Sequence, residues 1–421
     1  MKLALNKGRD KIDIQIPDQK VRDVILGSDI PGIPHDRISR IIQDGIRNHS
    51  PRDIAGRQVA VIIPDDTRAW ARGDRFVPDI IKTLFELGVP KEDITIIIAL
   101  GTHADLDPAG FERLAGRFCA ERVRIINSAN KNRDRLTHMG KTALGTDLYF
   151  TKEAAECDHI IIFGGVLHHM AAGYGGGRKY ILPGIAGYDS IQQNHSLTIQ
   201  PNGKPHPAVR QGELENNPVN RDITEGARIF LKGKTCTCVA VAANGAGELF
   251  HAQAGDLDTT FTESCRKLDR ACCVRVPQKG DFALISTGGH RTDTQLYQST
   301  KALFNAVDIV KEGAPVLFVA GCSEGVGNDI FASVLADYKD RPETMGLMLA
   351  RDFNMPAYVA FRVLDILHRF QVTLVSDLPQ ETARRLGFNH TDDIDGYIST
   401  LPGNGYIIPF AENILPVAAD P

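Results

Sequence analysis

Short apolar runs alternate with amphipathic segments along the first third of the chain. Residues 59–63 and 94–100 are apolar except for one threonine, and each run leads into a polar segment. Continuous apolar runs of this length are typical of strands buried on both faces of a parallel sheet. Between them, apolar residues recur at helical spacing, with Pro78 near the start and Gly88 just past the end. The pattern predicts a strand, a helix and a second, parallel strand.

The same reading predicts a series of further strands separated by helices. They are expected at residues 123–126, 160–163, 235–243, 247–251, 282–286, 316–320 and 372–376. The Asn244 and Gly245 pair is a hairpin turn signal, so the third and fourth of these strands should be antiparallel. Alternation of strands and helices in both halves of the chain predicts an α/β fold.

The 421 residues exceed what one hydrophobic core usually organises, so we expect two domains. The composition turns polar near residues 276–280, which predicts an N-terminal domain at 1–277 and a C-terminal domain at 278–421. Each should have a mainly parallel sheet flanked by helices, with the active site in the cleft between the domains. In this prediction, the last residues of the chain could pack back on the N-terminal domain.

Charge and leader signals narrow the function classes. Lysine and arginine number 48 against 52 aspartates and glutamates, so no global field favours nucleic acid or an anionic membrane. The N-terminus lacks a signal-peptide pattern, and no apolar run reaches about 18 residues. We therefore expect a soluble, cytoplasmic protein with a small-molecule partner. The eight cysteines form no CxxC pair and are expected to be buried small hydrophobes.

Polar residues follow three of the predicted strands. Asp65, Thr67 and Arg68 follow the first, and His103 follows the second. The third leads into the segment HHMAAGYGGGRK, residues 168–179. Because α/β proteins bind ligands at the carboxyl ends of parallel strands, these residues are expected to share one site.

The segment 168–179 joins two histidines to a glycine-rich loop and a lysine. Backbone without Cβ atoms can approach an anion closely, so Gly173, Tyr174, Gly175, Gly176 and Gly177 could hold a phosphate. The pattern is not that of a Walker nucleotide loop, since the lysine follows three glycines and precedes Tyr180. Lys179 could be a phosphate counter-ion or a nucleophile, with Arg178 favouring its neutral form, and spacing alone does not separate these roles.

Candidate substrate contacts lie in both halves. The planar fork of Arg68 suits a carboxylate, although a helix cap with a local salt bridge would explain residues 65–68 equally well. In the second half, Gln298 and Lys301 are three residues apart and so share a helix face, next to Tyr297. An amphipathic helix with exposed polar residues is the simpler explanation for that segment.

Taken together, PDDTR, GTH, HHMAAGYGGGRKYILPG, His195 and YQSTK resemble the lactate racemase family, the nickel-pincer-nucleotide racemases and epimerases of 2-hydroxy acids. The resemblance implies that Lys179 binds the cofactor, a pyridinium bisthiocarboxylic acid mononucleotide, covalently through a thioamide, and that His195 is the protein ligand to nickel. It implies that His103 and His169 are the acid/base pair. Arg68 and Lys301 would bind the substrate carboxylate, with Tyr297 and Gln298 lining the pocket and Asp65 and Thr67 near the nucleotide.

Two departures from the family pattern bear on the substrate. The family commonly has phenylalanine where this chain has Ala171, and serine or threonine where it has Gly175. The smaller side chain predicts a 2-hydroxy acid bulkier than lactate, such as a sugar acid, as the partner. His168 stands where proline is more common, so alanine variants of His168 and His169 should differ sharply in activity, with the latter inactive.

The resemblance also implies cofactor-assembly proteins as partners, and the sequence leaves homo-oligomer formation open. Two alternatives remain: a relative that uses a non-covalent nucleotide, for which Lys179 would be dispensable, and a non-catalytic nucleotide or phosphate binder. Retention of His103, His169 and His195 together disfavours the second alternative, since a phosphate sensor needs no acid/base pair.

Overall fold

The computed structural model describes residues 1–27, 30–244, 246–290 and 293–419. The chain forms two compact units. The central unit comprises Ile30–Thr198 and Pro207–Arg270, and the terminal unit comprises Met1–Asp29, Ile199–His206 and Ala271–Pro421. This division differs from the predicted single boundary at residue 277, because the N-terminal segment belongs with the C-terminal part of the chain.

The central unit is built on one six-stranded sheet with the strand order β13-β12-β9-β4-β5-β6. Neighbouring strands are parallel except β12 and β13, so the predicted hairpin is confirmed. Gly245 of its predicted turn lies outside the described residues. The strands are β4 (Val59–Pro64), β5 (Ile94–Ala99), β6 (Arg124–Asn127), β9 (His159–Gly165), β12 (Thr235–Ala243) and β13 (Leu249–Gly255).

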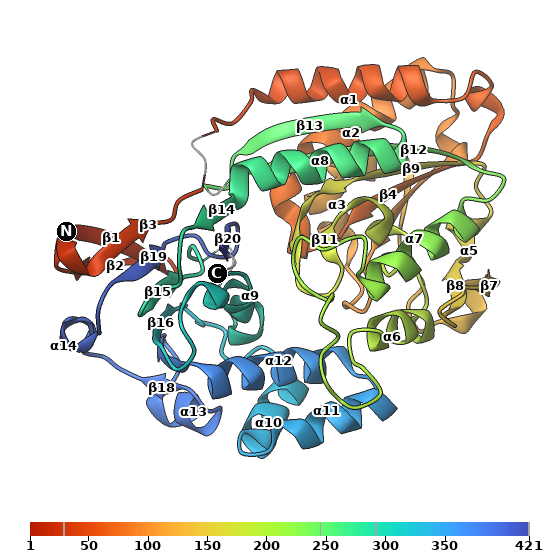
Figure 1. Ribbon diagram of the computed structural model, residues 1–421. Coiled ribbons are helices and arrows are strands. Elements are labelled where there is room, and N and C mark those ends of the chain that lie inside the picture. The colour runs from red at the N-terminus through yellow and green to blue at the C-terminus, as the bar shows by residue number, and fades with distance from the viewer. Residues whose placement is uncertain (28–29, 245, 291–292, 420–421) are drawn as a thin grey trace. The chain divides into compact units, whose positions relative to one another are not determined.

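Helices cover both faces of this sheet. Along β4, Val59 and Val61 enter one hydrophobic core with α1 and α2, whereas Ala60 and Ile62 enter a second core with α7. Figure 1 shows α1 and α7 on opposite faces of the sheet. Two covered faces explain why the strands are apolar without alternation. The helices are α1 (His35–His49), α2 (Gly73–Glu86), α3 (Pro108–Ala115), α4 (Arg117–Ala120), α5 (Lys152–Ala155), α6 (Tyr188–Ser196), α7 (Pro218–Phe230) and α8 (Leu257–Cys272).

Smaller elements of the central unit carry most of the candidate residues. A short helix, η3 (Asp66–Ala71), follows β4, and η6 (Gly177–Tyr180) carries Lys179. Strands β10 (Leu167–His169) and β11 (Gly173–Gly175) form a small antiparallel ribbon directly after β9. A second hairpin joins β7 (Leu136–Lys141) to β8 (Asp147–Thr151).

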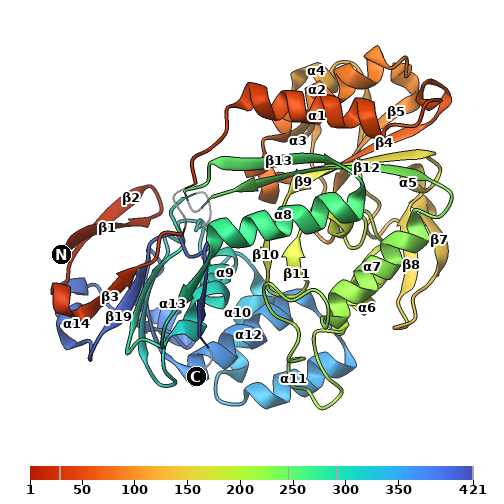
Figure 2. The ribbon, with the colours of Figure 1, turned by 45° about the horizontal axis from the view of Figure 1, so that its top comes forward.

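The terminal unit has its own six-stranded parallel sheet, in the order β18-β17-β16-β15-β19-β3. Strand β3, near the N-terminus, forms its edge beside β19, as Figure 2 shows. The final strand β20 pairs with β14, which precedes the predicted boundary. The strands are β1 (Lys2–Lys7), β2 (Asp10–Gln15), β3 (Val21–Val24), β14 (Cys273–Val276), β15 (Ala283–Ser286), β16 (Pro315–Val319), β17 (Gln371–Val375), β18 (Asn389–His390), β19 (Gly405–Ile408) and β20 (Leu415–Ala418).

The β1–β2 hairpin explains why the N-terminal segment belongs to this unit. Its apolar residues Leu5 and Ile14 are buried in one core with Phe282 and Leu317 of the terminal sheet. The helices are α9 (Leu296–Ala306), α10 (Asp329–Tyr338), α11 (Pro342–Arg351), α12 (Met355–Arg369), α13 (Gln380–Arg385) and α14 (Ile394–Thr400). The predicted α/β class, with mainly parallel sheets flanked by helices, is confirmed.

All eight cysteines are free, and six of them are buried, in agreement with a packing role. Among the described residues, no helix combines the length and the apolar character needed to cross a lipid bilayer.

Buried His159, at the start of β9, should make the central unit sensitive to acid. Burial and, less strongly, the charge of Arg57 lower its pKa to about 4, while its ring nitrogens contact the hydroxyls of Thr235 and Thr237. The unfolded chain takes up this proton near pH 6.5, so stability should fall with falling pH between about 6.5 and 4, by at most about 1.4 kcal/mol per pH unit.

The test is urea unfolding at both ends of this window, followed by the fluorescence of Trp70, the only tryptophan. His159→Gln should reduce the loss of stability at the acidic end relative to the unsubstituted protein. The exposed His138 gives the matched control, His138→Gln, which should leave the loss unchanged. An equal loss in all three proteins would contradict the assignment to His159.

Candidate functional site

Asp65 lies at the carboxyl end of β4 and is buried. Its Oδ1 accepts a hydrogen bond of 2.5 Å from the Thr67 hydroxyl, and its Oδ2 pairs with Nδ1 of His103. Burial raises the pKa of this carboxyl. The hydrogen bond and the charge of His103, together with the hydrogen bond from Thr67, lower the pKa by more than burial raises it. The pKa is therefore lowered, and Asp65 is ionised at neutral pH.

His103 follows β5, and its side chain is half exposed. An ionised carboxylate only accepts hydrogen bonds, so Nδ1 of His103 must donate to Asp65. In the neutral ring, Nε2 then carries the lone pair and can act as a base. The sequence analysis predicted that polar residues at the carboxyl ends of the strands lie close together, and this is confirmed for Asp65 and His103. It did not predict that the two side chains pair directly with each other.

Arg68 lies in η3 beside this pair and is partly exposed. Its Nη1 donates to the carbonyl oxygen and the hydroxyl of Thr67, at 3.0 and 3.3 Å. These bonds hold one edge of the guanidinium against η3. A carboxylate could be bound by the remaining donors of the planar group.

The two adjacent histidines of the β10–β11 ribbon have different surroundings. His168 is buried opposite Tyr174, and both side chains bond to Asp269 of α8, His168 Nε2 at 2.8 Å and the Tyr174 hydroxyl at 2.7 and 2.8 Å. His168 and Tyr174 thus attach the ribbon to α8. These contacts give His168 a structural role and leave His169 as the candidate for chemistry.

His169 is held in part by backbone N–H groups. Its Nδ1 accepts hydrogen bonds from the N–H groups of Ala171 at 3.1 Å and Ala172 at 3.2 Å. Ala171 is fully buried, and its carbonyl oxygen accepts from Asn217 at 3.0 Å. Residues 169–172 therefore form a tight turn in which Nδ1 of His169 has no proton.

The glycines of the loop are required by close packing inside the protein. A Cβ at Gly173 would lie 2.0 Å from Glu213 O, one at Gly176 would lie 2.7 Å from Gly165 O, and one at Gly177 would lie 2.6 Å from the Phe261 ring. All three have positive φ. Packing alone explains these three glycines, whereas Gly175 has only ordinary contacts with Leu167. Contact of the loop with a phosphate stays a prediction.

Gly164, at the end of β9, lies directly beneath the ring of Tyr180. A Cβ there would come within 2.4 Å of the ring, so Gly164→Ala should destabilise the central unit by about 1–3 kcal/mol through overpacking. Urea unfolding measures this effect. Gly56→Ala is the matched control, since no atom lies within 4 Å of its added Cβ, and it should change stability by less than about 0.5 kcal/mol. A loss of equal size in both variants would contradict the packing argument.

Lys179 is positioned by its neighbours on both sides. Arg178 donates to Asp258 at 2.7 Å and to Thr224 at 3.0 Å, and so attaches η6 to α8 and α7. This pairing gives Arg178 a structural role, and its effect on the charge of Lys179 stays a prediction. After the lysine, Gly184 N donates to Lys179 O at 3.0 Å, and Gly184 O accepts from Gly101 N at 2.9 Å. The backbone at Lys179 is thus connected to the loop that carries His103.

His195 is buried on α6, and its Nδ1 donates to the carbonyl oxygen of Ile191 at 3.1 Å. Burial, and next the charge of Lys179, lower its pKa to about 3, so the ring is neutral and Nε2 carries the lone pair. Metal-binding histidines commonly donate their other ring N–H to a backbone carbonyl in this way. The effect of the Lys179 charge on this pKa also places His195 near Lys179.

A buried carboxylate anchors α6. Asp222 of α7 accepts hydrogen bonds from the hydroxyls of Thr142 and Thr146 and, at 2.8 Å, from Nδ2 of Asn194, the residue before His195. Its side chain is fully buried. Asp222 and Asp269 were not identified from the sequence. Each is an isolated acidic residue on a helix, and no local pattern separates such a residue from an exposed one.

The residues fit a metal held jointly by protein and an organic group. Among the residues that the structure describes, no group of three or more histidine, cysteine, aspartate or glutamate side chains could hold a metal ion. Nε2 of His195 could supply one ligand to nickel, and a bound organic molecule could supply the others. Lys179, whose charge acts on His195, carries an amine that could attach such a molecule.

The predicted residues of the second half lie on α9 in the terminal unit. Lys301 Nζ donates to Gln298 Oε1 at 2.5 Å, so the two side chains share a helix face as their spacing predicts. Tyr297 packs edge-on against Phe331, with ring centroids 5.3 Å apart, and burial raises its pKa to about 12. The role of Tyr297, Gln298 and Lys301 in substrate binding stays a prediction.

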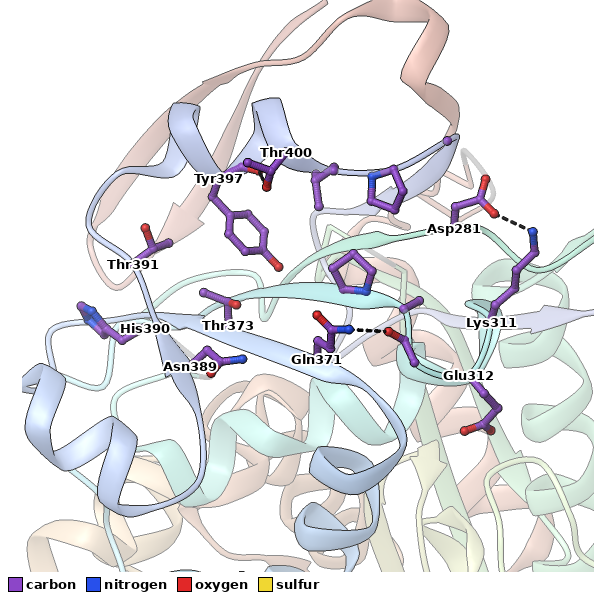
Figure 3. Close-up of a pocket in the computed structure, with 16 residues that line it drawn as sticks. Asp281, Lys311, Glu312, Gln371, Thr373, Asn389, His390, Thr391, Tyr397 and Thr400 are labelled. Carbon is purple, nitrogen blue, oxygen red and sulfur yellow. Dashed lines mark hydrogen bonds and ion pairs between the residues drawn. The ribbon is translucent and has the colours of Figure 1, made fainter.

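The terminal unit also contains a polar pocket of about 990 Å³, shown in Figure 3. It includes Pro315 and Gln371, the first residues of β16 and β17, so it lies at the amino ends of the parallel strands. Asp281 and Lys311 form an ion pair at one side. None of the predicted site residues lines this pocket, and ligands of α/β folds bind at the opposite strand ends.

Two family models match the chain. One, the lactate racemase N-terminal domain, matches residues 7–205, and the other, the lactate racemase C-terminal domain, matches residues 276–401. The lactate racemase of Thermoanaerobacterium thermosaccharolyticum is 26% identical over 378 residues, 88% of this chain and 87% of that protein. That of Lactiplantibacillus plantarum is 28% identical over 333 residues, 77% and 75% of the two chains.

Solved structures show the same fold. The lactate racemase apoprotein from Thermoanaerobacterium thermosaccharolyticum matches with a TM-score of 0.86 at 22% identity, over the full length of both chains. A Thermotoga maritima protein matches with a TM-score of 0.70 at 15% identity, over 94% of this chain and all of that one. At these identities the structural likeness concerns the fold.

Proposed function

Because this chain belongs to the lactate racemase family, and is an isomerase of the racemase and epimerase type, we propose that it interconverts the two configurations of a 2-hydroxy acid with a nickel-pincer nucleotide. One observation carries the proposal: His195 is buried and neutral, its Nδ1 donates to a backbone carbonyl so that Nε2 carries the lone pair, and the charge of Lys179 acts on its ring. A structural histidine would not require a neighbouring lysine.

We propose that Lys179 attaches the cofactor through a thioamide and that His195 binds its nickel. When bound, this group supplies a pyridinium ring that can accept a hydride and return it. The rest of the site would be made by the chain. Thr67 and the Gly173–Gly175 ribbon are the candidate nucleotide contacts, whereas both carboxylate oxygens of Asp65 are engaged with Thr67 and His103. We therefore assign Asp65 to His103 instead of the nucleotide.

Substrate binding requires positive charge for the carboxylate and a polar group at the hydroxyl. Arg68 keeps donors available beyond its two bonds to Thr67, and Lys301 with Gln298 offers a second polar pair. His103 and His169 would contact the hydroxyl oxygen as the acid/base pair of the family. A 2-hydroxy acid meets these requirements, since its carboxylate and hydroxyl lie on adjacent carbons.

The proposal on substrate size concerns Ala171, where the family commonly has phenylalanine. The backbone N–H of Ala171 donates to Nδ1 of His169, so this residue lies against a proposed catalytic histidine. We propose that the alanine leaves room for a 2-hydroxy acid bulkier than lactate, such as a sugar acid.

The experiment measures racemisation by the cofactor-loaded enzyme on lactate and on longer 2-hydroxy acids. The unsubstituted enzyme should prefer the longer substrates, and Ala171→Phe should shift the ratio of kcat/KM toward lactate by about tenfold or more. Ala171→Ser, which adds one atom, is the control and should leave the ratio nearly unchanged. Equal ratios in the unsubstituted enzyme and Ala171→Phe would contradict the size argument, and no racemisation of any 2-hydroxy acid would contradict the function.

A further inference from the structure

Helix α7 makes polar contacts with two segments that carry proposed cofactor residues. Its Asp222 accepts a hydrogen bond of 2.8 Å from the asparagine that precedes His195. Its Thr224 accepts one of 3.0 Å from the arginine that precedes Lys179. Figures 1 and 2 both show α7 beside α6, the helix of His195. One helix therefore connects the proposed nickel ligand to the proposed point of cofactor attachment.

Asn217, the residue directly before α7, makes a third connection. Its side chain is fully buried, and Nδ2 donates a hydrogen bond of 3.0 Å to the carbonyl oxygen of Ala171. Ala171 belongs to the turn at 169–172, in which two backbone N–H groups donate to Nδ1 of His169. Asn217 thus joins the start of α7 to the turn that carries a proposed catalytic histidine.

The other partners of Asn217 determine the orientation of its amide. Oδ1 accepts hydrogen bonds from the backbone N–H groups of Val219 at 3.0 Å and Asn220 at 3.3 Å, and so caps the first turn of α7. Only the oxygen of an amide accepts such bonds, so the NH2 group must face Ala171. One end of the side chain therefore caps the helix, while the other end holds the turn.

The far end of the turn is held by backbone contacts. Gly212 N donates to Gly173 O at 3.0 Å, and the backbone at Gly173 lies so close to Glu213 that a Cβ would come within 2.0 Å of its carbonyl oxygen. These contacts need no particular side chain at position 217. A substitution of Asn217 should therefore release one end of the turn while the other end stays attached.

We propose that Asn217 is a positioning residue: by attaching Ala171 to the start of α7, it holds His169 in register with Lys179 and His195. This inference rests on the proposed function, in which these three residues act on one substrate and one cofactor. A displacement of about 1 Å in a catalytic group can cost about a hundredfold in rate. The buried amide of Asn217 thus controls turnover without touching the substrate.

Serine separates the two functions of Asn217, because its hydroxyl can cap a helix but does not extend to Ala171. With cofactor-loaded enzyme, Asn217→Ser and Asn217→Ala should both lower kcat by about tenfold to a hundredfold, with little change in KM. In urea unfolding, the serine variant should be the more stable of the two. If Asn217→Ser keeps the kcat of the unsubstituted enzyme, the residue only caps α7 and the inference is wrong.

Asn354 provides the matched control. It caps α12 in the terminal unit by accepting a hydrogen bond of 3.1 Å from the N–H of Ala357. Asn354→Ala should lower stability through the loss of a cap and leave kcat unchanged. An equal loss of kcat in Asn354→Ala and Asn217→Ser would trace the effect to general destabilisation and would contradict the positioning role.

A second measurement needs neither cofactor nor activity. Hydrogen exchange with mass spectrometry reports how often the N–H groups of Ala171 and Ala172 leave Nδ1 of His169. Asn217→Ser should raise the exchange rate of the segment 169–173 by about tenfold or more and leave that of β4 unchanged. Unchanged exchange of 169–173 would overturn the inference even if the enzyme racemises. Faster exchange in a chain that racemises no 2-hydroxy acid would support the attachment to α7 and contradict the proposed function.

Discussion

Replacing Lys179 with alanine is expected to remove the covalent cofactor and to lower racemisation by more than about a thousandfold, while the protein remains folded. The charge of Lys179 acts on His195, whereas the fold of η6 depends on Arg178, Tyr180 and backbone bonds that the substitution leaves in place. Intact-mass analysis of protein produced with the cofactor-assembly proteins measures the attachment, and Trp70 fluorescence measures folding.

Lys179→Arg is the matched control for charge. Arginine keeps a cation beside His195 but does not form the thioamide, so it should be as inactive as Lys179→Ala. Activity retained in the arginine variant would mean that Lys179 serves as a counter-ion. A covalent adduct that persists in Lys179→Ala would place the attachment on a different residue.

The second large effect is expected at Asp222, whose side chain is fully buried on α7. Asp222→Ala leaves Thr142, Thr146 and Asn194 without their buried acceptor and should lower the free energy of unfolding by about 2–5 kcal/mol. Because Asn194 precedes His195, the same substitution should weaken nickel binding in the protein that remains folded. Urea unfolding and nickel content per chain are the two measurements.

Asp189 offers the matched control on α6 itself. It is exposed and forms a surface ion pair with Arg133 at 2.7 Å, so Asp189→Ala should cost less than about 1 kcal/mol. A similar small loss in both variants would mean that the buried network does not hold α6.

The apolar pattern predicted the strands well because burial on both faces leaves a direct trace in the sequence. Val59 to Pro64 is buried at every position, and the predicted run ends one residue earlier. The N-terminal segment was assigned to the wrong part of the chain because β3 pairs with β19 from the opposite end of the sequence. A pairing so distant in sequence leaves no local signal.

The strand-end argument placed Asp65 and His103 correctly because parallel strands bring their carboxyl ends to one edge. It could not predict that Asp65 pairs with the histidine, nor that backbone N–H groups determine the tautomer of His169. The glycine-rich loop was interpreted differently from the sequence. Its pattern predicted a close approach of the backbone to a ligand, whereas at Gly173, Gly176 and Gly177 the backbone lies close to other residues of the protein.

We propose that this chain holds a covalent nickel cofactor between Lys179 and His195. The direct measurement is the intact mass and nickel content of the chain produced with the cofactor-assembly proteins. The account predicts a mass adduct with about one nickel per chain, with the nickel lost in His195→Ala and the adduct lost in Lys179→Ala. An unsubstituted chain that racemises its substrate without either adduct or nickel would contradict it.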